Sequence, residues 1–436
     1  MIELLRRADP ACSAVVTDDG VTTYGELVAR AEAVATVLLD REMRRFAVVD
    51  PNATTVATLL AGASLAGVEA CQYPPLDDVV EIAELAARFD HETVVTPFAA
   101  LPARDAAAPV LEPPERRPLL VLTTGTTGIP RGVGHDWGRL LRGTRRIAPA
   151  PGQRWLLAYG LHQFAGLQLL LHVFAAGATL VAPALRRPRE GLAAMRAHAV
   201  THASATPTYW RFLLAELRAD GGPVPRLEQI TLGGEAIPAP VLSELANVFP
   251  AARLSQVYAA SEFGSSGSVR DGRSGLSLDV LERGDDADVA MKIVDGELWV
   301  RSRIGMLGYY GEPPIDPDGW RPTGDLVDVV GDRIQFRGRS SEVVNVGGVK
   351  VHPLPIEERV GAVAGVDMAR VYGRPNPMTG AIVAVEIVPA PGADHDALRD
   401  AIRAACADLP PAARPRSIRF VESVSLAGDK IVRRSP

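Results

Sequence analysis

Short runs of apolar and β-branched residues alternate with helix-length segments between residue 46 and about residue 258. The runs cover residues 46–49, 93–95, 119–122, 178–181 and 229–232. Parallel strands need crossover connections, and helices usually supply them. Pro207 and Pro240 suit the first turn of a helix, where an N–H group would have no partner. The alternation therefore predicts an α/β fold with a large N-terminal domain of mostly parallel, helix-covered sheets.

The pattern changes after residue 275 to paired strands with tight turns. Asp295-Gly296 separates the runs at residues 291–294 and 297–301, and Gly331-Asp332 separates two further runs at residues 328–330 and 333–336. Such dipeptides between alternating strands are typical of hairpins. We therefore expect a β subdomain here.

A further unit is expected from about residue 340. It would contain a helix from Pro355, a hairpin around residues 366–388, a helix over residues 394–407 and a strand near Ile418. Its length is plausible for a small α+β domain. The predicted domains are residues 1–338 and residues 339–436.

Asp, Glu, Lys and Arg are absent between Arg154 and Arg186, a length that would suit a membrane span. Glycines, glutamines, histidines and Pro183 interrupt the segment, and both flanks are basic, without the asymmetry that orients a span. We therefore expect a buried strand, helix and strand, and no membrane span.

Charge and cysteine content narrow the class of protein further. A net charge of -6, from 46 basic and 52 acidic residues, argues against a nucleic-acid partner. Charged residues within the first ten positions leave no room for a signal peptide. Cys12, Cys71 and Cys406 are too few and too scattered for a disulfide framework or a zinc site. We expect a cytoplasmic protein.

The strongest local signal for chemistry directly follows an apolar run. It reads Leu122-Thr123-Thr124-Gly125-Thr126-Thr127-Gly128-Ile129-Pro130-Arg131-Gly132. Glycine N–H groups, threonine hydroxyls and a cation together suit a phosphate. The alternative is a flexible turn. The spacing fits neither the Walker A pattern nor a G-x-G-x-x-G turn.

This segment resembles the phosphate loop of the acyl-adenylate-forming enzymes, which include acyl-CoA synthetases, peptide-synthetase adenylation domains and luciferases. Further motifs follow in the order of that family. They are Gly233-Gly234-Glu235-Ala236, Tyr258-Ala259-Ala260-Ser261-Glu262, Thr323-Gly324-Asp325, Gly338-Arg339, Gly347-Gly348-Val349-Lys350 and Gly428-Asp429-Lys430. The chain is identified as a member of this superfamily.

The resemblance implies a reaction in which ATP activates an organic carboxylic acid, so that an acyl-adenylate forms and pyrophosphate leaves. It assigns the ATP phosphates to the loop from Thr123 to Gly128 with Arg131, and Mg²⁺ to Glu262, an oxygen ligand suited to that ion. Adenine would lie between the Gly234-Glu235-Ala236 backbone and the ring of Tyr258, in the same motif as Ser261. Glu262 could instead be a solvated loop carboxylate.

Asp325 resembles the carboxylate that holds the ribose hydroxyls, and Arg339 the cation beside ribose and phosphate. Asp325 could alternatively only cap its turn. Lys430 resembles the catalytic lysine that bridges the substrate carboxylate and the α-phosphate, a task suited to a compact ammonium group. The alternative for Lys430 is an ordinary frayed chain end.

A second half-reaction would transfer the acyl group to coenzyme A or to the phosphopantetheine of a carrier protein. The resemblance implies a mobile C-terminal domain that turns about a hinge near Ser341 and presents Lys430 in one orientation. The other orientation would bring Gly348 and Lys350 to the thiol cofactor.

The acid itself would bind near His162, with Ser204 and Gly233 in another wall of the pocket. In related sequences the residue at the position of His162 lines the carboxylate end of the acyl pocket. A lone buried histidine is more often structural. The sequence does not name the acid.

Several positions depart from the family pattern. Arg131 replaces the usual lysine, Ala259 a glycine and Ser261 a threonine, while Ser341 replaces the hinge aspartate and Asn345 a frequent lysine. The phosphate loop also begins early, which implies a shortened N-terminal region. Three functions remain open: an acid:thiol ligase, an adenylating enzyme with a non-thiol acceptor such as an amine, and a catalytically silent nucleotide-binding protein.

Overall fold

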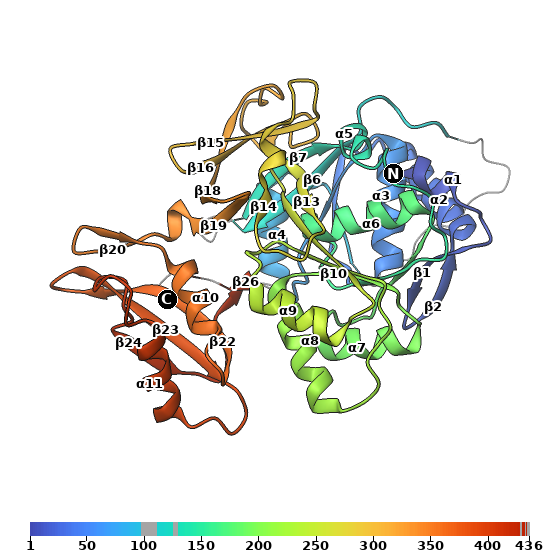
Figure 1. Cartoon of the computed structure of the whole chain (residues 1–436). Helices are drawn as coiled ribbons and strands as arrows, with labels where there is room; N and C mark the ends of the chain where they lie inside the picture. Colours follow the sequence, from blue (N-terminus) through green and yellow to red (C-terminus); the bar gives the residue numbers. More distant parts are fainter. Residues whose placement is uncertain (97–110, 125–129, 428–429, 432, 434–436) are drawn as a thin grey trace.

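The structure is a computed structural model, and it describes residues 1–96, 111–124, 130–427, 430–431 and 433. The predicted α/β architecture is present, with two mixed sheets and their helices, a β-rich layer and a C-terminal α+β unit (Figure 1). The proline-containing stretch at residues 97–110 and the centre of the predicted phosphate loop, residues 125–129, lie outside the described residues.

The largest sheet has the strand order β13-β12-β11-β10-β8-β9-β1-β2. Its interior pairings are parallel, whereas the edge strands β13 and β2 are antiparallel to their neighbours. The bounds are β1 Ser13–Thr17, β2 Gly20–Thr23, β8 Arg154–Leu157, β9 Thr179–Val181, β10 His202–Ala205, β11 Gln229–Gly233, β12 Arg253–Ala260 and β13 Gly264–Val269.

A second sheet has the order β17-β7-β6-β4-β3-β5. Its β3, β4, β5 and β6 pair in parallel, and β7 folds back on β6 as a hairpin that β17 extends. The bounds are β3 Arg45–Val48, β4 Glu69–Gln72, β5 Val94–Val95, β6 Pro118–Thr124, β7 Pro130–Asp136 and β17 Gly308–Tyr309.

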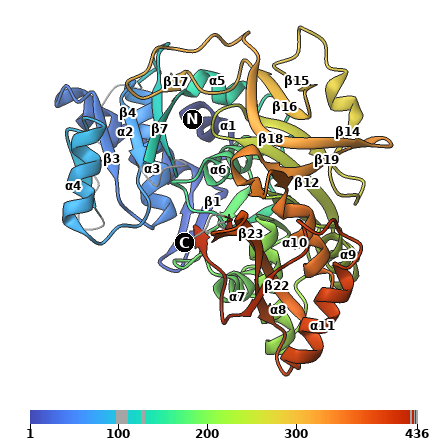
Figure 2. The same cartoon turned by 90° about the vertical axis from the view of Figure 1, so that its left-hand side faces the viewer.

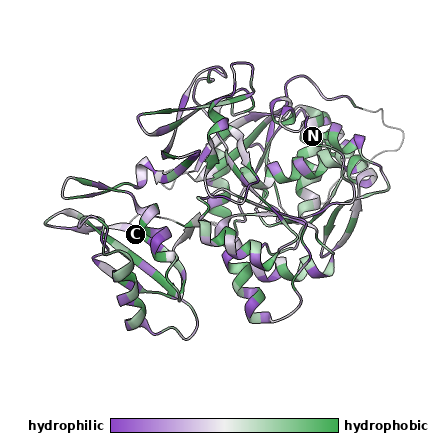
Figure 3. Cartoon of the chain, in the orientation of Figure 1, coloured by the Kyte–Doolittle hydropathy of each residue, from purple (hydrophilic) through white to green (hydrophobic). Residues whose placement is uncertain are grey.

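Helices cover both sheets, and the most apolar of them, α3 and α6, are buried along most of their length (Figure 3). The predicted uncharged strand, helix and strand are β8, α6 and β9. Among the described residues, no helix is long and apolar enough to cross a membrane. The helices are α1 Ile2–Arg7, α2 Tyr24–Asp40, α3 Ala53–Ala66, α4 Val79–Arg88, α5 Trp137–Arg142, α6 Phe164–Ala176, α7 Pro188–Ala197, α8 Pro207–Asp220 and α9 Ala239–Val248.

The β-rich layer is a sheet of order β14-β19-β18-β16-β15 with its own apolar core. Both predicted hairpins occur in it, as β15–β16 and β18–β19. The bounds are β14 Leu276–Ser277, β15 Val289–Val294, β16 Glu297–Ser302, β18 Arg321–Val330 and β19 Arg333–Arg339, with the short helix η1 Leu278–Leu281.

The C-terminal unit follows the short helix η2, Ser340–Glu342. Its sheet, of order β22-β23-β24, packs with α10 and α11 around a separate core (Figure 2). The bounds are β20 Val344–Val346, β21 Val349–Val351, α10 Pro353–Gly361, β22 Val366–Asn376, β23 Gly380–Pro389, α11 His395–Ala405, β24 Ser417–Phe420, β25 Leu426–Ala427 and β26 Lys430–Ile431.

Candidate active site

The carboxyl ends of β8, β10, β11 and β12 meet at one edge of the largest sheet. Ser204 pairs in register with Leu157 and Thr231, and Gly233 pairs with Val257. Open α/β sheets bind ligands at this edge, because the loops that follow parallel strands converge there. The register therefore brings the loops that carry His162 and Gly234 to the same edge as Tyr258, near the end of β12.

The predicted phosphate loop joins β6 to β7, so Thr123 and Arg131 lie opposite each other in a hairpin. Gly125, Thr126, Thr127 and Gly128 fall outside the described residues, as does the side chain of Thr124. Arg131 forms a 2.6 Å ion pair with Glu312, and its guanidinium carbon lies 3.4 Å from the centre of the Tyr309 ring. We predicted Arg131 as a phosphate ligand, and in the structure its guanidinium forms an ion pair with the Glu312 carboxylate.

Glu262 lies beside the same hairpin. The Tyr309 hydroxyl donates a 3.2 Å hydrogen bond to its Oε1. Burial and the charge of Glu262 raise the pKa of Tyr309 to about 12, so the hydroxyl stays protonated as a donor. Among the described residues no group of three or more His, Cys, Asp or Glu side chains could hold a metal ion alone. A single carboxylate fits Mg²⁺ when nucleotide phosphates supply further oxygens.

Three predicted residues form one polar chain between the first sheet and the β-rich layer. The Tyr258 hydroxyl donates a 2.6 Å hydrogen bond to Asp325 Oδ2, and Arg339 Nε lies 3.2 Å from Asp325 Oδ1. Asp325 and Arg339 are partners in the β18–β19 register. The charge of Asp325 raises the pKa of Arg339, while burial and then Asp325 raise that of Tyr258. Asp325 is 13% exposed and Arg339 54%, so a ligand can still reach the pair.

A pocket lies where the adenine is expected. Gly234 directly follows the end of β11. Its φ of +83° is a conformation that favours glycine, and the backbone turns there toward Glu235 and Ala236. Tyr258 forms the opposite wall, with its ring against Phe263 and Phe336. The lining includes Glu235, Ala236, Ile237, Gln256, Val257, Tyr258, Gly275, Phe336 and Glu358. Ser261 lies in the turn after β12, beside Glu262.

Glu235 joins the pocket to the chain end that carries Lys430. Its Oε1 accepts a 3.0 Å hydrogen bond from the Ile431 N–H, and its Oε2 accepts one of 3.1 Å from the Thr208 N–H. Lys430 pairs through its backbone with Ala427 in the β25–β26 hairpin. The side chain of Lys430 lies outside the part of the chain that the structure describes. The backbone next to Lys430 therefore contacts the predicted adenine motif.

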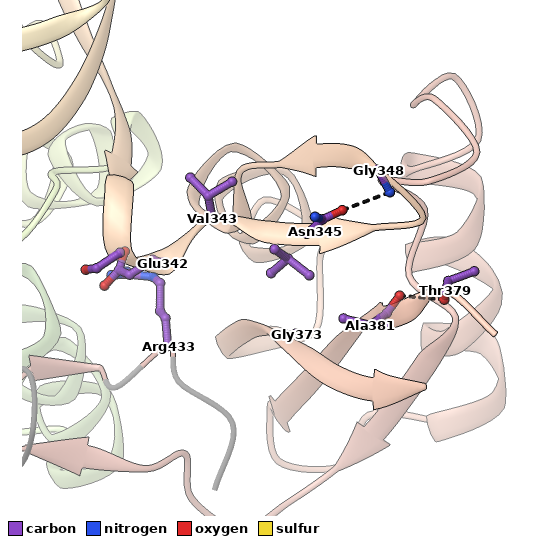
Figure 4. Close-up of a pocket in the computed structure, with 11 residues that line it drawn as sticks. Glu342, Val343, Asn345, Gly348, Gly373, Thr379, Ala381 and Arg433 are labelled. Carbon is purple, nitrogen blue, oxygen red and sulfur yellow. Dashed lines mark hydrogen bonds and ion pairs between the residues drawn. The ribbon is translucent and has the colours of Figure 1, made fainter. Parts of the chain in front are cut away.

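Gly348 and Lys350 are not brought to this pocket. They belong to the β20–β21 hairpin at the outer side of the C-terminal unit (Figure 1), where the Gly348 N–H donates to Asn345 Oδ1 at 2.8 Å. Gly348 instead lines an open groove of about 580 Å³ near Ser341 (Figure 4). Glu342 and Arg433, whose charged atoms are 3.8 Å apart, lie at the other end of this groove.

His162 lies in the turn before α6, and not on the helix itself. Its ring packs so closely on Gly160 that a Cβ placed on Gly160 would lie 2.3 Å from the ring. Burial and then the charge of Arg186 lower the pKa of His162 to about 4. The imidazole is therefore neutral at physiological pH, and it can line a pocket but cannot attract a carboxylate by charge.

The sequence analysis missed several residues that complete the site. Tyr309 and Glu312 belong to the turn-rich segment Gly308-Tyr309-Tyr310-Gly311-Glu312, and only the pairing of β17 with β7 brings them to Arg131. Arg433 was missed as well, although it follows Lys430 by three positions. It forms ion pairs with Glu357 at 2.6 Å and Glu342 at 3.8 Å.

Several known proteins are similar to this chain in sequence or structure. The medium/long-chain-fatty-acid–[acyl-carrier-protein] ligase FadD10 of Mycobacterium tuberculosis is 27% identical over 94% of this chain and 82% of its own. The crystal structure of the anthranilate CoA ligase AuaEII with anthranoyl-AMP has a TM-score of 0.84, 19% identity, and coverage of 99% of this chain and 95% of that one. The structure of the amide bond synthetase McbA of Marinactinospora thermotolerans has a TM-score of 0.77 and 20% identity, and the match covers 98% of this chain and 97% of that one.

Two family models match the sequence itself. The model of the AMP-binding enzymes matches residues 77–310, more than half of the chain, and includes the phosphate loop and the motifs at Gly234 and Tyr258. The model of the C-terminal domain of these enzymes matches residues 355–428. The protein therefore belongs to the AMP-binding enzymes, the acyl-adenylate-forming superfamily that its motifs resemble.

Proposed function

We propose that the protein is an AMP-forming acid:thiol ligase. A carboxylate oxygen of an organic acid would attack the α-phosphorus of ATP, and the bond to the β-phosphate would break to release pyrophosphate. A thiolate of coenzyme A or carrier-bound phosphopantetheine would then attack the acyl carbon and release AMP. Family membership supports the adenylation step, and relatives with acyl-carrier-protein and CoA acceptors support a thiol as the acceptor.

One observation carries this proposal. The Ile431 N–H donates a hydrogen bond to Glu235, which lines the same pocket as Tyr258, and this contact supports a role for Lys430 at the proposed nucleotide site. The ammonium group of Lys430 would neutralise charge that develops between the carboxylate and the α-phosphate. Preorganised charge of this kind is usually the largest contribution to rate acceleration.

The remaining predicted residues would bind and orient the nucleotide. Asp325 would accept hydrogen bonds from the ribose hydroxyls, held in place by Tyr258 and Arg339. Glu262 would hold Mg²⁺, which would offset phosphate charge when bound. Each of these groups acts best when it is fixed before the substrate arrives, and the hydrogen bonds of the site provide that rigidity.

We further propose that residues 1–338 and 339–436 act as two domains that turn about Ser341. In the present arrangement the Ile431 backbone, next to Lys430, contacts Glu235 of the proposed nucleotide pocket, while Gly348 and Lys350 belong to the β20–β21 hairpin outside it. A rotation of the second domain would be needed to bring Gly348 and Lys350 to the acyl-adenylate. This arrangement therefore suits the first half-reaction.

The direct test is pyrophosphate release with a panel of alkyl and aryl carboxylic acids. At least one acid should release pyrophosphate, and mass spectrometry should detect its thioester after addition of coenzyme A or a phosphopantetheine-bearing carrier protein. Release of orthophosphate would contradict the adenylation step. A product formed only with added amines would show that the acceptor is an amine and that the second step forms an amide instead of a thioester.

A further inference from the structure

Two neighbouring tyrosines, Tyr309 and Tyr310, each donate a hydrogen bond to a different carboxylate. The Tyr309 hydroxyl donates to Glu262 Oε1 at 3.2 Å, and the Tyr310 hydroxyl donates to Asp90 Oδ2 at 2.6 Å. Tyr310 also accepts a 2.5 Å hydrogen bond from Arg45 Nη1. Asp90 and Arg45 lie outside every motif of the site. The two hydroxyls therefore join one short segment to two different parts of the molecule.

The backbone that precedes Tyr309 holds Glu262 by further contacts. The Met306 N–H donates a 3.1 Å hydrogen bond to the Glu262 carbonyl oxygen. Gly305 lies against the same turn, because a Cβ placed on Gly305 would lie 2.6 Å from that oxygen. The pairing of β17 with β7 ties this segment to the hairpin of the phosphate loop. Residues 305–309 therefore fix the main chain of Glu262, and the Tyr309 hydroxyl contacts its side chain.

The ring of Tyr309 is held as well as its hydroxyl. The guanidinium carbon of Arg131 lies 3.4 Å from the centre of the ring, and Arg131 in turn pairs with Glu312 at 2.6 Å. A guanidinium group against an aromatic face is a favourable contact. These contacts form one chain from Glu312 to Glu262, in which each group limits the freedom of the next. Oε1 of Glu262 thus has a fixed donor, whereas Oε2 has no hydrogen-bond partner among the described residues.

We infer that Tyr309 is a positioning residue, which holds Oε1 of Glu262 so that Oε2 stays available to Mg²⁺. The inference rests on the proposed function, which assigns the metal to Glu262, and extends it to a residue outside the motifs that predicted the site. Carboxylates that bind metal ions are usually oriented by a further hydrogen bond, and loss of that partner weakens the metal site. A tyrosine hydroxyl suits this task because it is a neutral donor, so it orients the carboxylate without cancelling the negative charge that attracts the cation.

The test compares Tyr309→Phe with Tyr310→Phe as the matched control. Each substitution removes one hydroxyl and keeps the ring, and the two positions are neighbours in the same segment. Titration calorimetry would measure the Kd for ATP with Mg²⁺, and again with EDTA in place of the metal. We expect the Kd with Mg²⁺ to rise about 10- to 100-fold in Tyr309→Phe, as when the partner of a metal-binding group is lost. The Kd with EDTA should stay close to the wild-type value, and Tyr310→Phe should bind ATP as the wild type does under both conditions.

Thermal unfolding separates a positioning role from a structural one. Tyr310→Phe removes two hydrogen bonds to charged groups, so it should lower the melting temperature of the ligand-free protein more than Tyr309→Phe does. ATP with Mg²⁺ should stabilise Tyr310→Phe as much as the wild type, and Tyr309→Phe less, because a ligand stabilises the state that binds it. Equal losses of affinity for ATP with Mg²⁺ in the two variants would assign both tyrosines to the fold and overturn the positioning role.

Two outcomes keep this inference distinct from the proposed function. If an acid supports pyrophosphate exchange while Tyr309→Phe binds ATP with Mg²⁺ normally, the positioning role is wrong and the ligase function stands. If the binding of ATP with Mg²⁺ depends on the Tyr309 hydroxyl but no acid supports exchange, the positioning role stands and the proposed function is wrong. A wild type that binds ATP equally well with Mg²⁺ and with EDTA would also overturn the role of Tyr309.

Discussion

The Tyr258 hydroxyl donates a 2.6 Å hydrogen bond to Asp325, although the two residues lie 67 positions apart and in different sheets. This bond fixes the carboxylate proposed to hold the ribose at the edge of the pocket that Tyr258 lines. The proposed nucleotide site therefore lies across the boundary between the largest sheet and the β-rich layer.

Asp325→Ala should mainly weaken nucleotide binding. The substitution removes a charged acceptor, a loss that corresponds to about a 10- to 100-fold rise in the Kd for ATP. Tyr258→Phe, the control, keeps the ring and the carboxylate and should weaken binding less. Titration calorimetry with ATP measures both variants, and an unchanged Kd for Asp325→Ala would contradict the ribose role.

Lys430→Ala should slow adenylation and leave the fold intact. Loss of a preorganised charge contact typically costs about 10²–10³ in rate, whereas a substitution near a chain end should change stability by less than about 0.5 kcal/mol. Pyrophosphate exchange measures the rate, and circular dichroism checks the fold. Normal exchange in this variant would remove Lys430 from the proposed mechanism.

Glu235→Ala should impair the first half-reaction more than the second. It removes the acceptor for the Ile431 N–H, so the segment of Lys430 loses its anchor at the pocket. Rates of pyrophosphate exchange should fall, while thioester formation from added acyl-adenylate should fall less. Glu244→Ala removes a surface carboxylate that pairs with Arg218 and serves as the control. Equal losses in both half-reactions would argue against an anchoring role.

Arg433 and Glu357 should stabilise the C-terminal unit jointly, through the ion pair that they form. Both side chains are largely buried, at 13% and 8% exposed. Arg433→Met alone would leave Glu357 charged and unpaired, which typically costs about 3–5 kcal/mol of unfolding free energy. The double variant Arg433→Met with Glu357→Gln should lose less unfolding free energy than Arg433→Met alone. Urea titration of Arg433→Met, Glu357→Gln and the double variant gives these free energies, and additive losses would show that the two residues act independently.

His135 should make the protein sensitive to acid. The ring is 1% exposed, stacks on Phe164 and has no hydrogen-bond partner for either nitrogen among the described residues. Burial and then the charge of Arg139 lower its pKa to about 3. Its folded pKa is below the unfolded value of 6.5, so the unfolded chain binds a proton first as the pH falls.

Stability should therefore be highest above pH 6.5 and decline as the pH falls toward about 3. His135→Leu should show a smaller decline, because no imidazole then remains to be protonated on unfolding. Urea titrations at several pH values measure this difference, with His198→Leu, at a partly exposed position, as the control. An identical pH dependence of stability in the wild type and His135→Leu would refute the role of His135 in acid sensitivity.

Local patterns in the sequence were enough to predict several of the parallel strands (β3, β5, β6, β9 and β11), the hairpins of the β-rich layer and the buried segment formed by β8, α6 and β9. The hydrophobic period and the turn residues lie within each element, so each can be recognised alone. The N-terminal hairpin β1–β2 was not predicted, because its strands are short and join the sheet only through the pairing of β1 with β9.

The motifs include Glu235, Ala236 and Tyr258, which line the pocket between β11 and β12, but they do not predict the partners of the site residues. Arg131 has the expected place in the loop, yet its ion pair with Glu312 spans 181 positions. The buried N–H donors of Arg321, which have no partner within the described part of the chain, could not be foreseen either, since a lone arginine before a Thr-Gly-Asp turn carries no local signal. Pairings of this kind depend on how distant strands meet, which no short segment specifies.

If His162 lines the acid pocket, as its motif implies, the contact between Gly160 and His162 limits how the preference for one acid over another can evolve or be engineered. Any larger residue at position 160 would collide with the imidazole, so the two positions cannot be varied independently while histidine is kept. A smaller residue at position 162 would remove this collision, so that residues larger than glycine could then be introduced at position 160 as well. Libraries that randomise both codons together should therefore reach substrate scopes that single-site libraries miss.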